Sequence, residues 1–263
     1  MTRDDGRPVA LVTGVGRTVG IAAAIAQGLA VDGWDVATSW WTAYDDRMPW
    51  GRQSGDVDRI AAGLRAAGAA TVAVEADLQL VEAPAALFDE VQATLGPVTA
   101  LVMAHAESVD SAILDTTVAS FDRHVAVNAR ASWLLIAEFA RRLRDTGEVI
   151  DRAGDGAGRI VAITSDHTAG NLPYGASKGA LDRIVLAAAR ELADLRITAN
   201  VVNPGPVDTG WMSEHQRVKT LGENPRGRLG RPTDTAALVS FLCSPDGSWV
   251  NGQLLYSDGG LHA

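Results

Sequence analysis

The sequence predicts a doubly wound α/β fold, a single domain in which helices cover both faces of a seven-stranded parallel sheet. Two observations carry this prediction. Short β-branched or apolar runs alternate along the chain with longer alanine-rich segments of helical period, and runs such as "RIVAIT" are apolar almost throughout. Alternation of this kind is typical of a parallel sheet, and continuous apolarity is typical of strands covered on both faces. With 263 residues, 47% of them hydrophobic, the chain is long enough to bury one large core.

The expected elements alternate from one end of the chain to the other. Strands are predicted where apolar or β-branched residues form short runs, at 9–13, 35–40, 71–76, 99–104, 159–165, 197–203 and 253–258. Helices are predicted where alanine-rich segments have helical period, near 20–32, 56–67, 84–94, 119–144, 174–194 and 233–243. Two longer stretches, 41–55 and 207–231, have neither pattern. Because long loops in α/β proteins are commonly functional, we expect both to be irregular and the second to act as a substrate lid.

Charge and composition exclude several classes of partner. The formal net charge is −9 and no Lys/Arg cluster is visible, whereas a nucleic acid requires a basic face. The opening "MTRDDGRP" lacks a basic segment followed by an apolar core, and no apolar run approaches the roughly 20 residues of a membrane span. We therefore expect a cytoplasmic protein that binds neither nucleic acid nor membrane. The single cysteine, Cys243, is expected to fill core space, and no metal site is expected.

A glycine-rich stretch, "VTGVGRTVGIA", joins the first predicted strand to the first predicted helix. At this place Gly14 would allow a sharp turn, Gly20 would let strand and helix approach closely, and the helix start would face the phosphates of a dinucleotide. The spacing differs from G-x-G-x-x-G, because Val19 stands five residues after Gly14. Taken alone, the stretch is equally well explained as an ordinary strand-to-helix turn.

The segment "NLPYGASKGAL" places Tyr174 and Lys178 four residues apart near the start of a predicted helix. Both side chains then lie on one face, one turn from each other. A neighbouring ammonium stabilises a phenolate, so Lys178 would lower the pKa of Tyr174 and enable it to exchange a proton with an alcohol or ketone. For an isolated Y-x-x-x-K pair, a buried tyrosine and a solvated lysine would be the better interpretation.

These segments occur together with others in a fixed order, and the chain resembles the short-chain dehydrogenase/reductase family, especially its 3-oxoacyl-carrier-protein reductase type. The resemblance rests on "TGVGRTVG", "EADL", "VNARASWLL", "ITS", "YGASK", "NVVNPGPVDTG" and "GRPTDTAALVSFLCSPDGSWVNGQLLYSDGG". It implies one Rossmann-type domain over residues 1–263 and an NAD(P)-dependent oxidoreductase acting on CH–OH groups, with a small carbonyl compound or secondary alcohol as substrate.

The resemblance also implies roles for four residues. Tyr174 would be the acid in carbonyl reduction and the base in the reverse reaction, and Lys178 would lower its pKa and hold the nicotinamide ribose. Ser165 would bind the substrate oxygen as negative charge develops on it. Asn128 would fix a water that connects Lys178 to solvent. An amide on the helix surface is the alternative for Asn128, although asparagine is unfavourable within a helix.

The cofactor contacts implied by the family lie on several of the quoted segments. The residues expected to bind the dinucleotide are Gly14, Gly16, Arg17, Thr18, Gly20, Trp40, Asp77, Leu78, Lys178, Pro204, Gly205, Val207 and Thr209. Within this set Asp77 would meet the adenine amino group, and the residues of "NPGPVDT" would lie near the nicotinamide carboxamide. A helix N-cap is the alternative role for Asp77, and the two roles are compatible.

NADP(H) is favoured over NAD(H) by the residues near the second strand. Selection of NAD usually requires an acidic residue at the end of that strand. The segment here is "TSWWT", with Trp40 and Trp41 where a carboxylate would be expected. Arg17 in the glycine-rich stretch would give a 2′-phosphate a cationic partner. Arg47 and Arg52 would either add to this site or remain solvated.

The chain departs from the family pattern at three places. Thr18 replaces the middle glycine of the phosphate turn, so its hydroxyl could bind a phosphate or its bulk could shift the turn. "MAHA" (103–106) replaces the usual "NNAG", and His105 is expected to line the core or the cofactor wall rather than act as acid or base. Only eight residues separate Ser165 from Tyr174, which shortens the loop beside the substrate. Thr164 and Thr168 are the alternatives to Ser165.

The substrate and the assembly are less defined by the sequence. The segment after the sixth strand contains Trp211, Met212, His215 and Arg217, which indicates a pocket with apolar and polar walls. An acyl-carrier thioester is not preferred over a free ketone. The family commonly forms tetramers, so a homotetramer or homodimer is expected. The rival hypothesis is a regulatory protein that binds a dinucleotide on the same fold without turnover.

Overall fold

The computed structural model describes residues 6–145 and 158–262. Within these residues seven strands form one sheet, in the order β3-β2-β1-β4-β5-β6-β7, and every pairing is parallel. The strands are β1 (Val9–Thr13), β2 (Asp35–Trp40), β3 (Thr71–Glu75), β4 (Val98–Met103), β5 (Gly158–Ile163), β6 (Ile197–Asn203) and β7 (Leu254–Tyr256). The predicted doubly wound α/β class is confirmed, and only the last strand is clearly shorter than expected.

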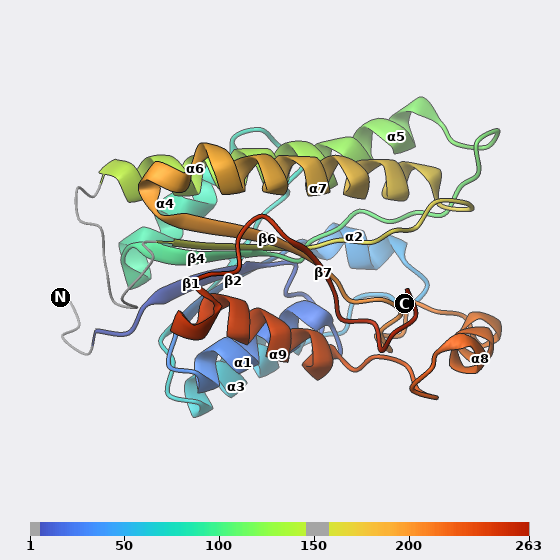
Figure 1. The fold of residues 1–263 in the computed structure, drawn as a ribbon, viewed down its shortest axis with the longest axis horizontal. Helices are drawn as coiled ribbons and strands as arrows, with labels where there is room; N and C mark the ends of the chain where they lie inside the picture. Colours follow the sequence, from blue (N-terminus) through green and yellow to red (C-terminus); the bar gives the residue numbers. More distant parts are fainter. Residues whose placement is uncertain (1–5, 146–157, 263) are drawn as a thin grey trace.

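Helices cover both faces of the sheet (Figure 1). One face carries α1 (Ile21–Val31), α3 (Asp56–Ala66) and α9 (Pro232–Cys243), and the other carries α4 (Ala83–Leu95), α6 (Ala131–Asp145) and α7 (Leu172–Glu191). From β1 the chain runs outward through β2 to β3 at one edge of the sheet. It then crosses back to β4, which pairs with the opposite side of β1. The reversal between β1 and β4 opens a crevice at the carboxyl ends of the strands, where α/β sheets bind ligands.

The core consists of one apolar cluster on each face of the sheet. The central strands β1, β5 and β6 are buried along their whole length, as the continuous apolar runs predict. Phe88 of α4 packs on Phe139 of α6 with their ring centroids 6.4 Å apart. Cys243 is 3% exposed at the end of α9, so its predicted role as a core residue is confirmed. In the described part of the chain, no helix is both long and apolar enough to cross a membrane.

The long helix expected at 119–144 is divided into three parts. Helix α5 (Val118–His124) continues into a π-helical turn (Val125–Arg130), which leads directly into α6. A π turn adds one residue to the helical repeat and is frequently found at functional sites. The apolar pattern continues through this turn, so periodicity alone did not reveal it.

Both segments expected to be irregular contain a helix. Residues 41–55 include α2 (Thr42–Arg47), and residues 207–231 include α8 (Glu214–Glu223), which Ser213 and Gln216 cap reciprocally. Neither helix buries a residue, so neither sequence carries the apolar stripe on which a helix prediction depends. Helix α7 begins two residues earlier than expected, with a proline in its first turn. Two short 3-10 turns, Ala193–Leu195 and Pro245–Gly247, complete the described elements.

The turn after β1 presses Gly14 against the backbone that follows β4. Gly14 has φ +80°, and a Cβ added there would lie 2.7 Å from the Cα of His105. Gly33, between α1 and β2, has φ +95° with open space around its missing Cβ. The two glycines therefore share the left-handed backbone and differ in their surroundings.

We predict that Gly33→Ala lowers the free energy of unfolding by about 1–2 kcal/mol, the cost of a left-handed alanine. Gly14→Ala should cost more than Gly33→Ala, because a collision with the β4 loop adds to the same backbone cost. Urea denaturation of both variants measures this difference. Equal losses would contradict the close contact between Gly14 and His105.

Candidate active site

A cleft of about 720 Å³ opens at the carboxyl ends of the strands. Its walls come from the turn after β1, the ends of β2 and β3, the loops after β4 and β5, helix α7 and the segment after β6. Most of the residues expected to act in catalysis or cofactor binding line it: Gly14, Gly16, Arg17, Gly20, Trp40, Asp77, Leu78, Ser165, Tyr174, Lys178, Pro204, Gly205, Val207 and Thr209. Thr18 and Asn128 are the two expected residues that lie outside its lining.

The glycine turn fits a diphosphate. Helix α1 begins at Ile21, and its N-cap is Gly20, which has no side chain to bind the first amide groups. Ile21 and Ala22 line the cleft, so the start of the helix faces it. Exposed amides and the helix dipole make such a helix start favourable for phosphate. The residues of this turn would hold the diphosphate of a nicotinamide dinucleotide.

Thr18 is bound to a carboxylate within the protein. Its amide donates to Asp56 Oδ2 at 3.0 Å, and its hydroxyl lies 3.4 Å from the same oxygen. Asp56 begins α3 and is also bound by Arg59. Burial favours a raised pKa for Asp56, but the bonds from Thr18 and Arg59 outweigh it and the pKa is lowered. The Thr18 hydroxyl is thus directed to Asp56 in this structure, and a phosphate contact or a shifted turn at Thr18 stays a prediction.

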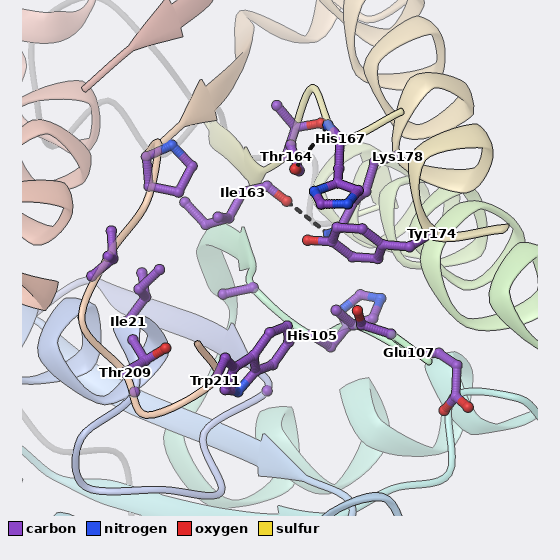
Figure 2. A pocket seen from close by; sticks show the side chains of 18 of the residues that line it. Ile21, His105, Glu107, Ile163, Thr164, His167, Tyr174, Lys178, Thr209 and Trp211 are labelled. Atoms are coloured by element: carbon purple, nitrogen blue, oxygen red, sulfur yellow. Dashed lines mark hydrogen bonds between the residues drawn. The ribbon is translucent and has the colours of Figure 1, made fainter. Parts of the chain in front are cut away.

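Tyr174 and Lys178 point into one part of the cleft from successive turns of α7 (Figure 2). Ser165 lines the same cleft next to Tyr174. The Lys178 ammonium lies 5.8 Å from the centre of the Tyr174 ring and donates to the carbonyl oxygen of Ile163 at 2.8 Å. Burial lowers the pKa of Lys178 to about 8, although the charge of Asp182 opposes the shift. Burial raises the pKa of Tyr174 to about 12, while a hydrogen bond with the Ser165 side chain lowers it. The expectation that Lys178 lowers the pKa of Tyr174 is therefore wrong for this structure, because burial prevails, and Tyr174 is a phenol at neutral pH.

Asn128 lies in the π turn and is fully buried, so the surface-amide alternative is wrong. Its amide oxygen accepts from Glu107 N, and its amide nitrogen donates to Glu107 O, both at 2.8 Å. The same nitrogen donates to Ser177 Oγ at 2.8 Å, and Ser177 in turn donates to the carbonyl oxygen of Tyr174. Asn128 therefore connects the loop after β4 to the turn of α7 that carries Tyr174.

His105 lies in the loop after β4, within the segment "MAHA", and is 7% exposed. Its Nε2 lies 3.1 Å from Val127 O, which can only accept, so Nε2 carries the proton and Nδ1 accepts from Thr13 Oγ1 at 2.7 Å. Burial and the charge of Lys178 lower the pKa of His105 to about 3. His105 is therefore a neutral wall residue joining β1 to the π turn, as expected.

The short loop between Ser165 and Tyr174 runs directly over the start of α7. A Cβ at Gly175 would collide with the carbonyl oxygen of His167, so the loop lies against this helix position only because it is glycine. The amide of His167 donates to Ser165 Oγ at 3.2 Å. Ser165 thus remains beside Tyr174 despite the shortening. Of the two alternatives, Thr164 lines the cleft and Thr168 does not.

At the nucleotide end of the cleft, two charged residues bind partners within the protein. Asp77 does not cap α4, whose N-cap is Glu82; its carboxylate instead accepts from the amide of Gln79 at 2.9 Å in a local turn. Arg47 lines the cleft as an exposed residue, so it is accessible to solvent, as one of its two alternatives has it. It forms a two-pronged ion pair with the buried Glu107, at 3.0 and 2.8 Å. Arg52 is paired with Asp46 on the surface, at 3.4 Å.

Three residues of the cleft and its rim were missed from the sequence. Glu107 follows β4, a position at which polar side chains meet ligands in such sheets, and this was an available signal. Tyr44 of α2 reaches across the cleft to donate to Ser108 O at 3.3 Å. Trp50 stacks on Trp211 at the edge, and no local pattern indicates this contact. Among the described residues, no group of three or more His, Cys, Asp or Glu side chains could hold a metal ion.

Comparison with known proteins agrees with this geometry. A family model described as "Enoyl-(Acyl carrier protein) reductase" matches residues 14–262. An uncharacterized oxidoreductase of Bacillus subtilis (strain 168) is 32% identical over 96% of each chain. An NADPH-dependent aldehyde reductase-like chloroplastic protein of Arabidopsis thaliana is 31% identical over 96% of this chain and 93% of its own.

Solved structures show the same likeness. A dehydrogenase/reductase from Sinorhizobium meliloti 1021 has a TM-score of 0.83 and 32% identity, covering 97% of this chain and 95% of its own. A short-chain dehydrogenase from Burkholderia cenocepacia J2315, solved in complex with NADP, has a TM-score of 0.83 and 31% identity, covering 97% and 98%. With the family match and the full-length relatives, the chain belongs to the short-chain dehydrogenase/reductase family of oxidoreductases.

Proposed function

We propose that this protein reduces a ketone or aldehyde to the corresponding alcohol with NADP(H), and catalyses the reverse oxidation. The observation that carries the proposal is the convergence of Tyr174, Lys178 and Ser165 in one cleft with the glycine turn. When bound, the nicotinamide supplies or accepts the hydride. The glycine turn and the segment from Pro204 to Thr209 would hold that dinucleotide.

In this proposal Tyr174 transfers its proton to the carbonyl oxygen of the substrate. The raised pKa of Tyr174 keeps that proton on the phenol until reduction begins. Ser165, which is hydrogen-bonded to the Tyr174 hydroxyl, would donate to the same substrate oxygen as it gains negative charge. Lys178 carries a positive charge below its pKa of about 8 and would stabilise the phenolate that remains.

Asn128 would act through its neighbours. Its bonds to Glu107 and Ser177 hold two walls of the cleft at a fixed separation. We propose that it also orders a water leading from Lys178 to solvent, by which the proton on Tyr174 is renewed. The buried position of Asn128, in a π turn beside α7, supports this role.

The preference for NADP(H) rests on the residues around the turn. Trp40 ends β2 without a carboxylate, and Arg17 lines the cleft nearby. Arg17 Nε is buried and has no hydrogen-bond partner among the described residues, which leaves a donor for a 2′-phosphate. The names of the Arabidopsis relative and the Burkholderia complex agree with this preference.

We further propose a homo-oligomer, a tetramer or dimer, in the cytoplasm. Apolar side chains are exposed on and near α5 and α6; they are Ile113, Leu114, Val118, Phe121 and Trp133. Exposed apolar groups of this kind are typical of protein interfaces. Sedimentation of the purified protein would determine the state.

We predict that Tyr174→Phe lowers the rate of reduction by about a hundred- to ten-thousandfold while leaving NADPH affinity nearly unchanged, because only the proton donor is lost. The assay follows NADPH oxidation with a panel of ketones, aldehydes and 3-oxoacyl thioesters. Tyr256→Phe, in an exposed tyrosine outside the cleft, is the control. Tight NADPH binding without turnover of any compound by the unchanged protein would favour the regulatory alternative.

We predict that the rate of reduction depends on pH through the ionisation of Lys178. Its pKa is lowered to about 8, so the ammonium is charged below this pH and neutral above it. Tyr174 stays protonated through this range, because its pKa is about 12. At saturating NADPH, kcat/KM for reduction should be level below about pH 8 and fall by about tenfold per pH unit above it. A rate that rises between pH 8 and 10 would contradict this role of Lys178.

Arg17→Gln should weaken NADPH binding by roughly tenfold to a hundredfold, since a charge-assisted bond to the 2′-phosphate is lost. NADH should be affected much less. Isothermal titration with both nucleotides gives the ratio of the two Kd values, and Arg17→Lys is the charge-preserving control. An equal loss for both nucleotides would show that the cofactor preference is misassigned.

A further inference from the structure

Three aromatic side chains from two distant segments meet at the rim of the cleft. Trp50, which follows α2, stacks on Trp211, which follows β6, with ring centroids 5.5 Å apart and planes 9° apart. Tyr44 of α2 lies 6.4 Å from both rings. Trp211 extends toward the Tyr174 side of the cleft in Figure 2. The two long loops of the chain are therefore in direct contact.

The glycine turn is joined to this group through Arg17. The Arg17 guanidinium lies 4.8 Å above the Trp50 ring, and its Nη2 donates to the carbonyl oxygen of Thr209 at 3.0 Å. We name Arg17, Tyr44, Trp50 and Trp211 the aromatic clasp. The clasp links the turn after β1, the loop after β2 and the segment after β6 across the mouth of the cleft.

The clasp is not part of the apolar core. Trp211 is 41% exposed, and Tyr44 and Trp50 are only partly buried. Stacked indoles and a guanidinium over an indole attract each other without requiring a buried environment. Such contacts can form and separate while the sheet and its covering helices stay in place.

The clasp spans the path that a dinucleotide has to take. A diphosphate at the glycine turn and a nicotinamide beside Tyr174 extend between that turn and Thr209, the two points that Arg17 joins. A ligand that leaves between the glycine turn and Thr209 would have to separate Arg17 from Thr209 and displace Trp211, which lines the same cleft and is held by Trp50. The contacts that close the clasp therefore oppose exchange of the ligand.

We propose that the aromatic clasp closes over the bound dinucleotide, and that separation of Trp50 from Trp211 limits its release. This inference rests on the proposed function only in requiring that NADPH binds in the cleft. It assigns Trp50 and Trp211 as residues that retain the cofactor, apart from any part in catalysis.

The test is the rate of NADPH release, measured by stopped-flow fluorescence when NADPH-loaded protein is mixed with excess NADP+. Trp50→Leu and Trp211→Leu should each raise the dissociation rate constant by about tenfold, the scale of one lost aromatic stack. The double variant should be little faster than either single variant, because each change already breaks the same contact. Trp249→Leu is the matched control, since Trp249 is 96% exposed and does not line the cleft.

A second measurement needs no nucleotide. The far-ultraviolet circular dichroism of the free protein should lose the exciton signal of two stacked indoles in Trp50→Leu and Trp211→Leu and keep it in Trp249→Leu. Normal NADPH binding with release rates equal to the control would overturn the clasp and leave the proposed function standing. A failure of the unchanged protein to bind NADPH at all would overturn both.

Discussion

The side-chain amide of Asn128 joins the elements that carry the proposed catalytic groups. It binds both backbone groups of Glu107 and, through Ser177, the turn of α7 that presents Tyr174. These partners are buried, so each bond lost would leave a polar group without water. The π turn brings Asn128 inward, since the same residue in a regular helix would be rotated relative to the sheet. The amide of Asn128 thus joins the β4 loop to α7 on the inner side of the cleft, and the bonds from Asn171 to Ser108 and Asp110 join the same two elements farther along the loop.

Acidic side chains surround a site that is proposed to bind an anion. Asp56 takes the Thr18 amide, and Asp45 lies close to Gly16. Burial raises the pKa of Asp45, although a bond from Trp50 opposes the shift. Asp56 keeps its charge and is paired with Arg59. The positive charge of Arg17 is therefore close to the carboxylates of Asp45 and Asp56. Asp56 also binds the turn at Thr18, the position at which the family has glycine.

The strands were predictable because each is a short run of apolar or β-branched residues, and three of them, β1, β5 and β6, are buried along their whole length. Helices α2 and α8 were not predictable, because they bury no side chain and have no apolar period. In the site, the glycine turn and the Tyr174–Lys178 pair are local in sequence and could be found. The Thr18–Asp56 contact spans 38 residues and the Arg47–Glu107 pair spans 60, so no local pattern could indicate either. The roles of the proposed residues come from the resemblance and remain predictions.

The contact between Gly175 and the carbonyl oxygen of His167 links two features that look separate in the sequence. The loop before α7 is short enough to press on the helix, and the helix has room for it only where a side chain is missing. The glycine cannot change while the loop stays short. A lineage that lengthened the loop would free position 175 to diversify, whereas one that kept it short would have to retain glycine there in every descendant.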